Sequence, residues 1–227
     1  MRHRPAPTRP ALLALASLLA LGCRSAARGA PGGEGAASGQ PVPADSGVGA
    51  RTLIPGGFGT LRQDDVALHL QLEGVQVKAI PLDESIIRTL SPDSYRALRD
   101  LKESRRAAVA SSARRNGLTR YNLWYVSYFG VAPEARFSPM EFIVTNSGRD
   151  FRPLDLVPLS SGFGEQRLKV RETQAALYIF DGELDASQPL TVRAETARND
   201  EWRNILQRIE RERALIRSRA TENRSGR

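Results

Sequence analysis

The residue types that most often perform catalysis or bind metals are scarce in this chain of 227 residues. It contains two histidines, His3 and His69, and a single cysteine, Cys23. His69 lies in an alternating stretch, on the side opposite a row of leucines, which predicts a surface position on a strand. A Ser-His-Asp arrangement or a common zinc or copper site would have to use His69 alone. We therefore predict no catalytic residue, no metal site and no cofactor.

Acidic residues offer a second route to chemistry. Asp181, Glu183 and Asp185 recur at every second position in "DGELD", and their oxygens could bind Ca²⁺. The spacing does not match an EF-hand, because the glycine is misplaced and no glutamate follows at the twelfth position. We interpret this stretch as a solvated hairpin loop, and Asp64-Asp65 as a turn before a strand.

Two glycine-rich loops, "PGGFGT" at 55–60 and "SSGFGE" at 160–165, could approach a ligand closely. Neither continues into Gly-Lys-Ser/Thr or lies between a strand and a helix, so neither predicts phosphate binding. Each loop carries one aromatic residue, Phe58 or Phe163, that it could present to a partner. The alternative is an ordinary turn with the phenylalanine packed inward.

The single cysteine follows a segment typical of export signals. Three arginines precede an uncharged Leu- and Ala-rich run at 10–22, which is too short to span a bilayer. Gly22 then directly precedes Cys23. This combination resembles the lipobox of bacterial lipoproteins, which implies signal cleavage after Gly22 and acylation of Cys23. The alternative is a plain secretory signal with an incidental cysteine.

Residues 24–50 consist mostly of Gly, Ala, Pro and Ser. Such a segment cannot bury enough apolar surface to offset its ordering entropy. We predict a disordered tether at 23–50 with an end-to-end distance of about 30 Å. The resemblance places the protein at the outer membrane facing the periplasm in a cell with two membranes, and otherwise on the outer face of the cytoplasmic membrane.

The formal net charge of +8 is unevenly distributed. Residues 96–115 carry seven basic and two acidic side chains, and residues 198–227 carry nine arginines and five acids. Neither stretch interleaves aromatic residues with its arginines, so we predict no binding of nucleic acid. Solvated helix faces, anionic lipid headgroups or an acidic partner all fit these stretches.

Residues 51–197 have the pattern of a strand-rich domain. Alternating apolar residues from Val66 predict a strand, followed by either a tight hairpin turn or a β-bulge at Gly74. Ser91-Pro92 begins and Asn116-Gly117 ends a helical insertion near 91–115. The stretch at 120–130 is apolar on both parities, which predicts a central strand. Short strands without regular βαβ alternation favour an antiparallel β-sandwich.

The segment that starts "FIVTNSGRDF" and continues through "ALYIF" to "PLTV" resembles the immunoglobulin-like sandwich domains of exported bacterial lipoproteins. The resemblance implies a fold and little function. We therefore expect a mainly β protein, with an immunoglobulin-like antiparallel β-sandwich, one inserted helix and a C-terminal amphipathic helix.

The C-terminal helix, expected within 198–227, has an apolar stripe that includes Trp202 and Ile209. Glu212 and Arg213 interrupt this stripe, so a long coiled coil is not expected. Trp202 either docks on the domain or contacts a partner. We expect the first half to dock and the basic end after Arg217 to fray.

These observations together predict a lipid-anchored cell-envelope protein with a non-catalytic binding or structural role. Its partners would be the membrane, through acylated Cys23, and a protein of unknown identity. One alternative is an enzyme that uses paired carboxylates on envelope polymers, which would need a cleft. The other is a module that lies on anionic membrane surfaces through its arginine-rich helices.

Overall fold

The computed structural model describes residues 44–45 and 53–225, which belong to one compact unit of the chain. The predicted signal peptide, with Gly22 and Cys23, and nearly all of the predicted tether lie outside the described residues. Within them the protein is mainly β, with antiparallel sheets and three α-helices, one of which is C-terminal. The expectation of a mainly β fold with a C-terminal helix is confirmed.

The larger sheet has the strand order β2-β3-β4-β10-β8, and all of these neighbours are antiparallel. Its strands are β2 (Leu68–Leu72), β3 (Val75–Pro81), β4 (Arg120–Gly130), β8 (Asp155–Pro158) and β10 (Thr173–Asp181). The short strand β1 (Ala44–Asp45) pairs in parallel with the beginning of β4.

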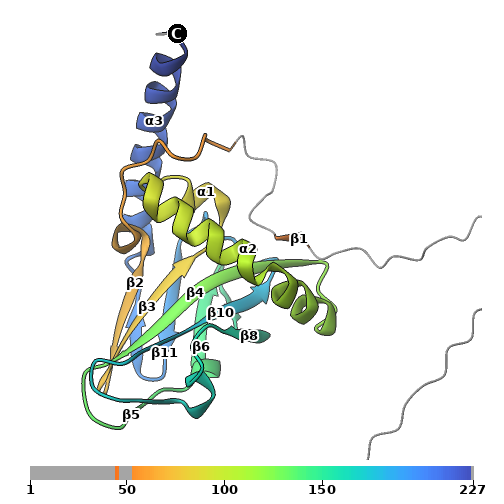
Figure 1. Ribbon diagram of the computed structural model, residues 1–227, viewed down its shortest axis with the longest axis vertical. Helices are drawn as coiled ribbons and strands as arrows, with labels where there is room; N and C mark the ends of the chain where they lie inside the picture. The colour runs from red at the N-terminus through yellow and green to blue at the C-terminus, as the bar shows by residue number, and fades with distance from the viewer. Residues whose placement is uncertain (1–43, 46–52, 226–227) are drawn as a thin grey trace, which may run out of the picture. The chain divides into compact units, whose positions relative to one another are not determined.

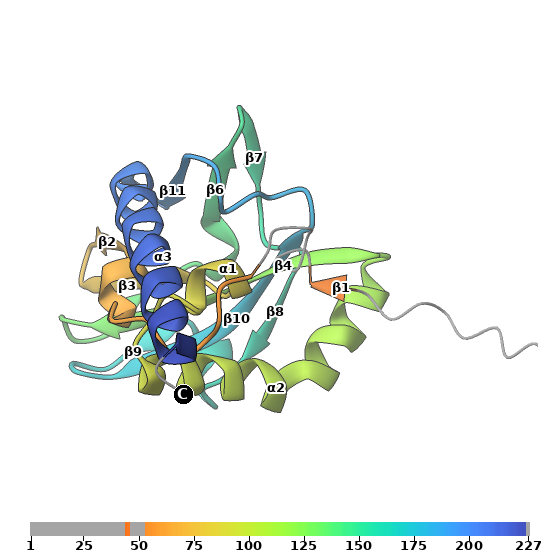
Figure 2. The same ribbon diagram turned by 90° about the horizontal axis from the view of Figure 1, so that it is seen from above.

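The smaller sheet has the strand order β12-β11-β6-β7 and is fully antiparallel. Its strands are β6 (Phe142–Asn146), β7 (Arg149–Phe151), β11 (Leu190–Ala194) and β12 (Ala197–Asn199). A third, two-stranded sheet pairs β5 (Ala135–Arg136) with β9 (Arg167–Leu168). Figure 2 shows the hairpin of β6 and β7 standing clear of the larger sheet.

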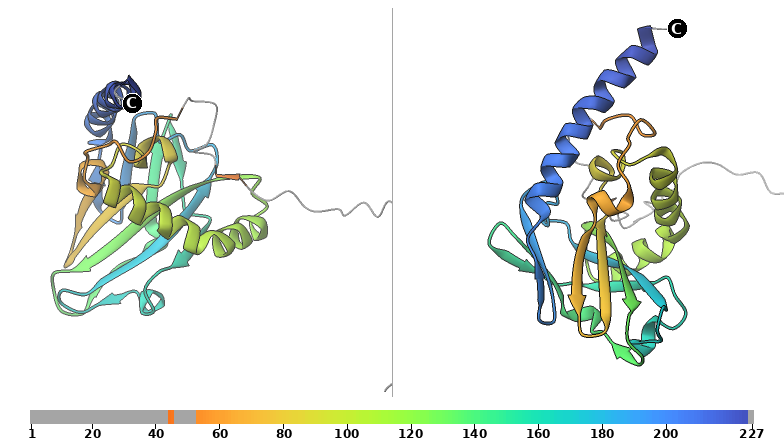
Figure 3. Two further views of the ribbon diagram at one scale, coloured as in Figure 1. Left: turned by 45° about the horizontal axis from the view of Figure 1, so that its top comes forward. Right: turned by 90° about the vertical axis from the view of Figure 1, so that its left-hand side faces the viewer.

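The helices connect and cover the sheets. The long helices are α2 (Pro92–Arg115) and α3 (Trp202–Ser225), and the short ones are α1 (Glu84–Ile87) and the 3₁₀ turns η2 (Gln63–Val66), η3 (Pro139–Glu141) and η4 (Phe163–Glu165). Helix α2 crosses the larger sheet over β4 and β10, whereas α3 lies beside β2 and projects past the strands (Figure 1). The right panel of Figure 3 places α2 and α3 on opposite sides of β2 and β3.

Local sequence signals explain the boundaries of several elements. Leu72 pairs with Val75 across a two-residue turn in which Gly74 has a φ of 72°, as a tight hairpin requires. Ser91 occupies the N-cap of α2, although its side chain makes no capping hydrogen bond. Gly117, with a φ of 67°, follows the end of α2 and lets the chain turn back.

A single hydrophobic core joins both sheets and α3. Trp124 of β4 is at its centre, and its ring centroid lies 6.3 Å from that of Phe142 in β6 and 5.9 Å from that of Phe180 in β10. The ring of Trp202, the first residue of α3, lies 6.3 Å from that of Trp124. Because β4 pairs with β3 on one side and β10 on the other, the prediction of a central strand is confirmed.

Candidate binding surface

Trp202 fixes the beginning of α3 to the domain. Its side chain is 0% exposed, and its indole Nε1 donates a hydrogen bond to the carbonyl oxygen of Ala186 at 2.9 Å. Ile209 and Ile216, about two and four turns farther along α3, are also fully buried. Trp202 therefore cannot contact a partner in this structure, because it is an internal anchor of the helix. The docking interpretation of this residue is the correct one.

Glu212 belongs to the contact between α3 and the domain, although its charge interrupts the apolar stripe of the helix. It is 5% exposed, and its Oε1 accepts hydrogen bonds from the Thr60 amide at 2.9 Å and the Thr60 hydroxyl at 3.0 Å. The guanidinium of Arg219 lies 2.8 Å from the same oxygen and also donates to the carbonyl of Phe58 at 2.9 Å. A carboxylate can be buried when several donors compensate for its lost hydration.

Arg213 has the corresponding role toward α1. Its Nε and Nη2 donate to the carbonyl oxygen of Ser85 at 3.2 and 2.8 Å, and its Nη1 pairs with Glu210. Nearer the start of the helix, Arg208 donates to the carbonyl of Asp65 at 2.7 Å. Glu212 and Arg213 do interrupt the apolar stripe of α3, but they do not interrupt its contact with the domain, since both bind polar groups there. The helix continues to Ser225, and Arg219 still contacts the domain beyond the point where fraying was expected.

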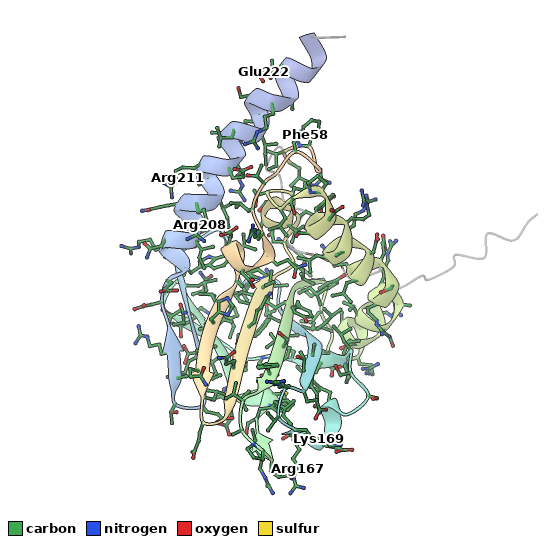
Figure 4. All side chains as sticks on the ribbon, turned by 60° about the vertical axis from the view of Figure 1, so that its left-hand side comes forward. Phe58, Arg167, Lys169, Arg208, Arg211 and Glu222 are labelled. Carbon is green, nitrogen blue, oxygen red and sulfur yellow. The ribbon has the colours of Figure 1, made fainter. Side chains whose placement is uncertain are left out.

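The two loop phenylalanines have different environments. Phe163 is 3% exposed and packs against Phe137, with 5.4 Å between ring centroids, so it is not a partner contact. Phe58 is only half-buried, and Figure 4 shows it near α3 at the end of the domain. Of the three candidate partner contacts, Phe58, Phe163 and Trp202, Phe58 alone retains substantial exposed surface.

The residues considered for catalysis are separated or engaged locally. His69 is exposed on β2. In the predicted hairpin loop, Asp181 Oδ1 accepts the Glu183 amide at 2.8 Å, Glu183 pairs with Arg149, and Asp185 Oδ1 accepts the Ser187 amide at 2.8 Å. These carboxylates shape the turn. In the part of the chain that the structure describes, no group of three His, Cys, Asp or Glu residues could hold a metal ion.

Asp64 and Asp155 are among the carboxylates whose pKa values are lowered. A hydrogen bond from Lys78, at 2.6 Å, holds the pKa of Asp64 below its ordinary value. Burial would raise the pKa of Asp155, but hydrogen bonds from Ser112, the Leu156 amide and Arg115 outweigh it and lower that pKa. Both groups remain ionised near neutral pH and attach surface elements to each other.

A buried pair of tyrosines was not predicted from the sequence. The hydroxyl oxygens of Tyr128 in β4 and Tyr178 in β10 lie 2.6 Å apart. Burial raises the pKa of both phenols, so both stay protonated at neutral pH. The two residues sit on neighbouring strands of one sheet, but their sequence separation left no local pattern that would pair them. Their shared hydrogen bond makes this pair a structural feature of the core.

The solvent-facing side of α3 carries three of its arginines. Arg203, Arg211 and Arg217 are exposed and form no ion pair with any residue that the structure describes. Figure 4 shows Arg211 pointing away from the domain. These guanidinium groups leave α3 with a basic outer face, while its inner face is fixed to the core.

Comparison with known proteins gives this surface no precedent: no protein family, no curated protein and no solved structure matches the chain. Among the described residues, no helix combines the length and the apolar character that crossing a membrane would require.

Proposed function

We propose that this protein is a lipid-anchored cell-envelope protein with a non-catalytic binding or structural role, accessory to an envelope complex or to another exported protein. The observation that carries the proposal is the position of Cys23, directly after Gly22 at the end of a signal-like run and before a tether-like segment. Acyl chains on Cys23 would hold the protein at a membrane, since two or more chains anchor stably where one binds only marginally.

The way in which the domain holds its N-terminal segment supports this proposal. Arg88 donates to the carbonyl of Ile54 at 3.1 Å, and Arg219 and Glu212 bind Phe58 and Thr60. A domain on a membrane tether must resist force at the point where the tether joins it. These contacts would transfer such force to α1 and α3.

We also propose that the two main sheets form an immunoglobulin-like sandwich with α2 inserted between β3 and β4. The support is the order of the strands along the chain, which passes from the larger sheet to the smaller one, back, and then to the smaller one again. Their inner faces contribute to one core. Alternation between two antiparallel sheets is typical of Greek-key sandwiches.

A second candidate function is binding to an anionic membrane surface through the basic outer face of α3. It is favoured by the three arginines of that face, Arg203, Arg211 and Arg217, which lack ion pairs within the described residues. Such binding would be electrostatic, so it would require anionic lipid and weaken with salt. Vesicles with and without phosphatidylglycerol, tested with a triple Arg→Gln variant at these positions, would detect it.

The main proposal is tested by expression of the full chain in a bacterial host that acylates lipoproteins. We expect the protein in the membrane fraction, with mass spectrometry showing a mature N-terminus at acylated Cys23. The variant Cys23→Ser should move to the soluble fraction, whereas the matched tether variant Ser25→Ala should stay with the membrane. An intact leader or a bare thiol at Cys23 in natively produced protein would refute the anchor.

A further inference from the structure

A polar hollow of about 500 Å³ lies where the smaller sheet meets the beginning of α3. Its walls come from four segments: the β6–β7 turn, the first residues of β11, strand β12 and the first turn of α3. The volume falls within the range of about 300–1,000 Å³ that is common for small-molecule sites. No residue proposed above as an anchor or as part of the contact between α3 and the domain lines it.

One wall of the hollow carries two arginines without ion pairs among the described residues. Arg198 is exposed on β12, and Arg203 is exposed in the first turn of α3. One carboxylate, Asp200, lies on the same wall, so the hollow keeps an excess of one positive charge. The positive end of the helix dipole of α3, a helix of 24 residues, adds to this potential.

The placement of Arg198 is electrostatically unfavourable, because another arginine lies next to it. Arg198 lies directly opposite Arg193 in the antiparallel register of β11 and β12. Arg193 is compensated by Asp150 at 3.2 Å, but no residue in the described part of the chain forms such an ion pair with Arg198. Like charges at directly opposed positions of a sheet destabilise it. A bound anion would supply the compensation that Arg198 lacks.

The rest of the lining offers neutral hydrogen-bonding groups. Thr145 of β6 and Thr191 of β11 are cross-strand neighbours, and Ser147 follows in the β6–β7 turn. The Thr145 hydroxyl donates to Asp150 Oδ1 at 2.6 Å, so toward a ligand it acts as an acceptor. Asn204 adds an amide from α3. Hydroxyls and amides both donate and accept, so they suit the hydroxyl groups of a sugar. Guanidinium groups suit the oxygens of a carboxylate or phosphate.

We propose that this hollow binds an anionic saccharide unit, whose carboxylate or phosphate group is held by Arg198 and Arg203 and whose hydroxyls face Thr145, Ser147 and Thr191. The inference deepens the proposed binding role and rests on it. It does not depend on acylation of Cys23, because every residue of the site lies in the folded domain.

The test measures binding of four small probes to the full chain by calorimetry and NMR titration. Glucuronate and glucose 6-phosphate carry both features, whereas glucose lacks the anion and inorganic phosphate lacks the sugar. We expect at least one of the first two to bind at least tenfold more tightly than glucose and inorganic phosphate. The identity of the tighter probe tells whether the anion is a carboxylate or a phosphate.

Variants then test whether the arginines and the hydroxyl-bearing residues of the hollow contribute to binding. Arg198→Ala and Arg203→Ala should each weaken the tighter probe at least fivefold, and Arg198→Lys should restore part of the loss. Thr191→Val should weaken the sugar-bearing probe but leave inorganic phosphate unchanged. Arg211→Ala, on the same helix but outside the hollow, is the matched control and should change nothing. Circular dichroism of each variant checks that the domain remains folded.

Three results would overturn the proposal. The first is no detectable binding of either anionic sugar, and the second is binding that Arg198→Ala leaves unchanged. The third is that neither anionic sugar binds more tightly than inorganic phosphate, because the hydroxyl-bearing residues would then contribute nothing. These results are independent of the Cys23→Ser fractionation, so failure of the hollow and failure of the anchor remain distinguishable.

Discussion

The two long helices have the same length and a similar excess of arginine, but the domain holds them in different ways. Helices α2 and α3 each have 24 residues. In α2, residues 103–108 are exposed in succession, and the helix meets the domain mainly before and after them, at Leu98 and around Val109. In α3, buried residues recur on every turn from Trp202 to Ile216. Helix α2 therefore contacts the domain on either side of its exposed middle, whereas α3 contacts the domain along most of its length.

The difference comes from where charged side chains find partners. In α2, Lys102 donates to the carbonyl of Leu82 at 2.8 Å and Arg115 reaches Asp155, while most other charges of the helix face solvent. In α3, Glu212 and Arg213 point inward to polar backbone groups of the domain. A charged residue on an amphipathic stripe is therefore not always an interruption, because the neighbouring surface can be polar at that point.

Loss of the Trp202 side chain should have the largest effect on the attachment of α3. We expect Trp202→Ala to lower the free energy of unfolding by about 3–5 kcal/mol, as removal of large buried side chains does. It also removes the hydrogen bond to Ala186. Urea unfolding followed by far-UV circular dichroism measures the change. The control is Leu215→Ala on the same helix, where the side chain is 50% exposed and a loss above about 0.5 kcal/mol is not expected.

Removal of the Glu212 carboxylate should have the next largest effect. We expect Glu212→Ala to cost about 2–3 kcal/mol, because hydrogen bonds to charged groups contribute more than neutral ones and Arg219 would lose its partner. Glu212→Gln, which retains an acceptor, should cost less, and the exposed Glu222→Ala should cost almost nothing. A double-mutant cycle with Thr60→Val measures the direct coupling. Additive effects of the two substitutions would show that the Thr60 hydroxyl contributes nothing, and that Glu212 acts through the Thr60 amide and Arg219.

Much of the fold was predictable because its signals are local. The alternation at 66–72 with a glycine at 74, the Ser-Pro start of α2 and the doubly apolar stretch of β4 each lie within a few residues. Each pattern indicates directly either a backbone conformation or which face of the element is buried. The mainly β class follows from the number and spacing of such segments.

The polar contacts were not predictable, because they join residues that are far apart in the sequence. Glu212 meets Thr60 across 152 positions, and Ser112 meets Asp155 across 43. No local period records which loop will lie beside a helix, so a charge on an apolar stripe was interpreted as an interruption. The hollow at Arg198 and Arg203 has four separate segments as walls, and no single motif marks it. Tertiary packing decides these features.

The contact between α2 and β8 should contribute less than the α3 contacts and should depend on pH. Ser112 donates to Asp155 Oδ2, and Arg115 lies 2.9 Å from the same oxygen. We expect Ser112→Ala to cost about 1–2 kcal/mol at neutral pH, a typical value for one charge-assisted hydrogen bond. Ser104→Ala, on the exposed part of α2, is the control.

The sign of the pH dependence follows from the lowered pKa of Asp155. The stabilisation is complete above the ordinary pKa of 3.8 and is lost as the pH falls through the lower pKa of the folded state. The difference between the wild type and Ser112→Ala should therefore shrink below that range, and NMR titration of Asp155 should show a higher pKa in the variant. A difference that is constant from neutral to strongly acidic pH would contradict this assignment.

The smallest effect is expected in the exposed middle of α2. Arg106 and Glu103 are 3.8 Å apart, but their side chains are 75% and 61% exposed, so water and salt screen their attraction. We expect Arg106→Ala to change the free energy of unfolding by less than about 0.5 kcal/mol in urea titrations at low and high salt. A loss above 1 kcal/mol would mean that this exposed ion pair stabilises the domain, and α2 and α3 would then not differ in the way described above. A small loss would show that arginine content alone does not determine how firmly a helix is attached. What matters is where its arginines lie relative to the polar groups of the domain.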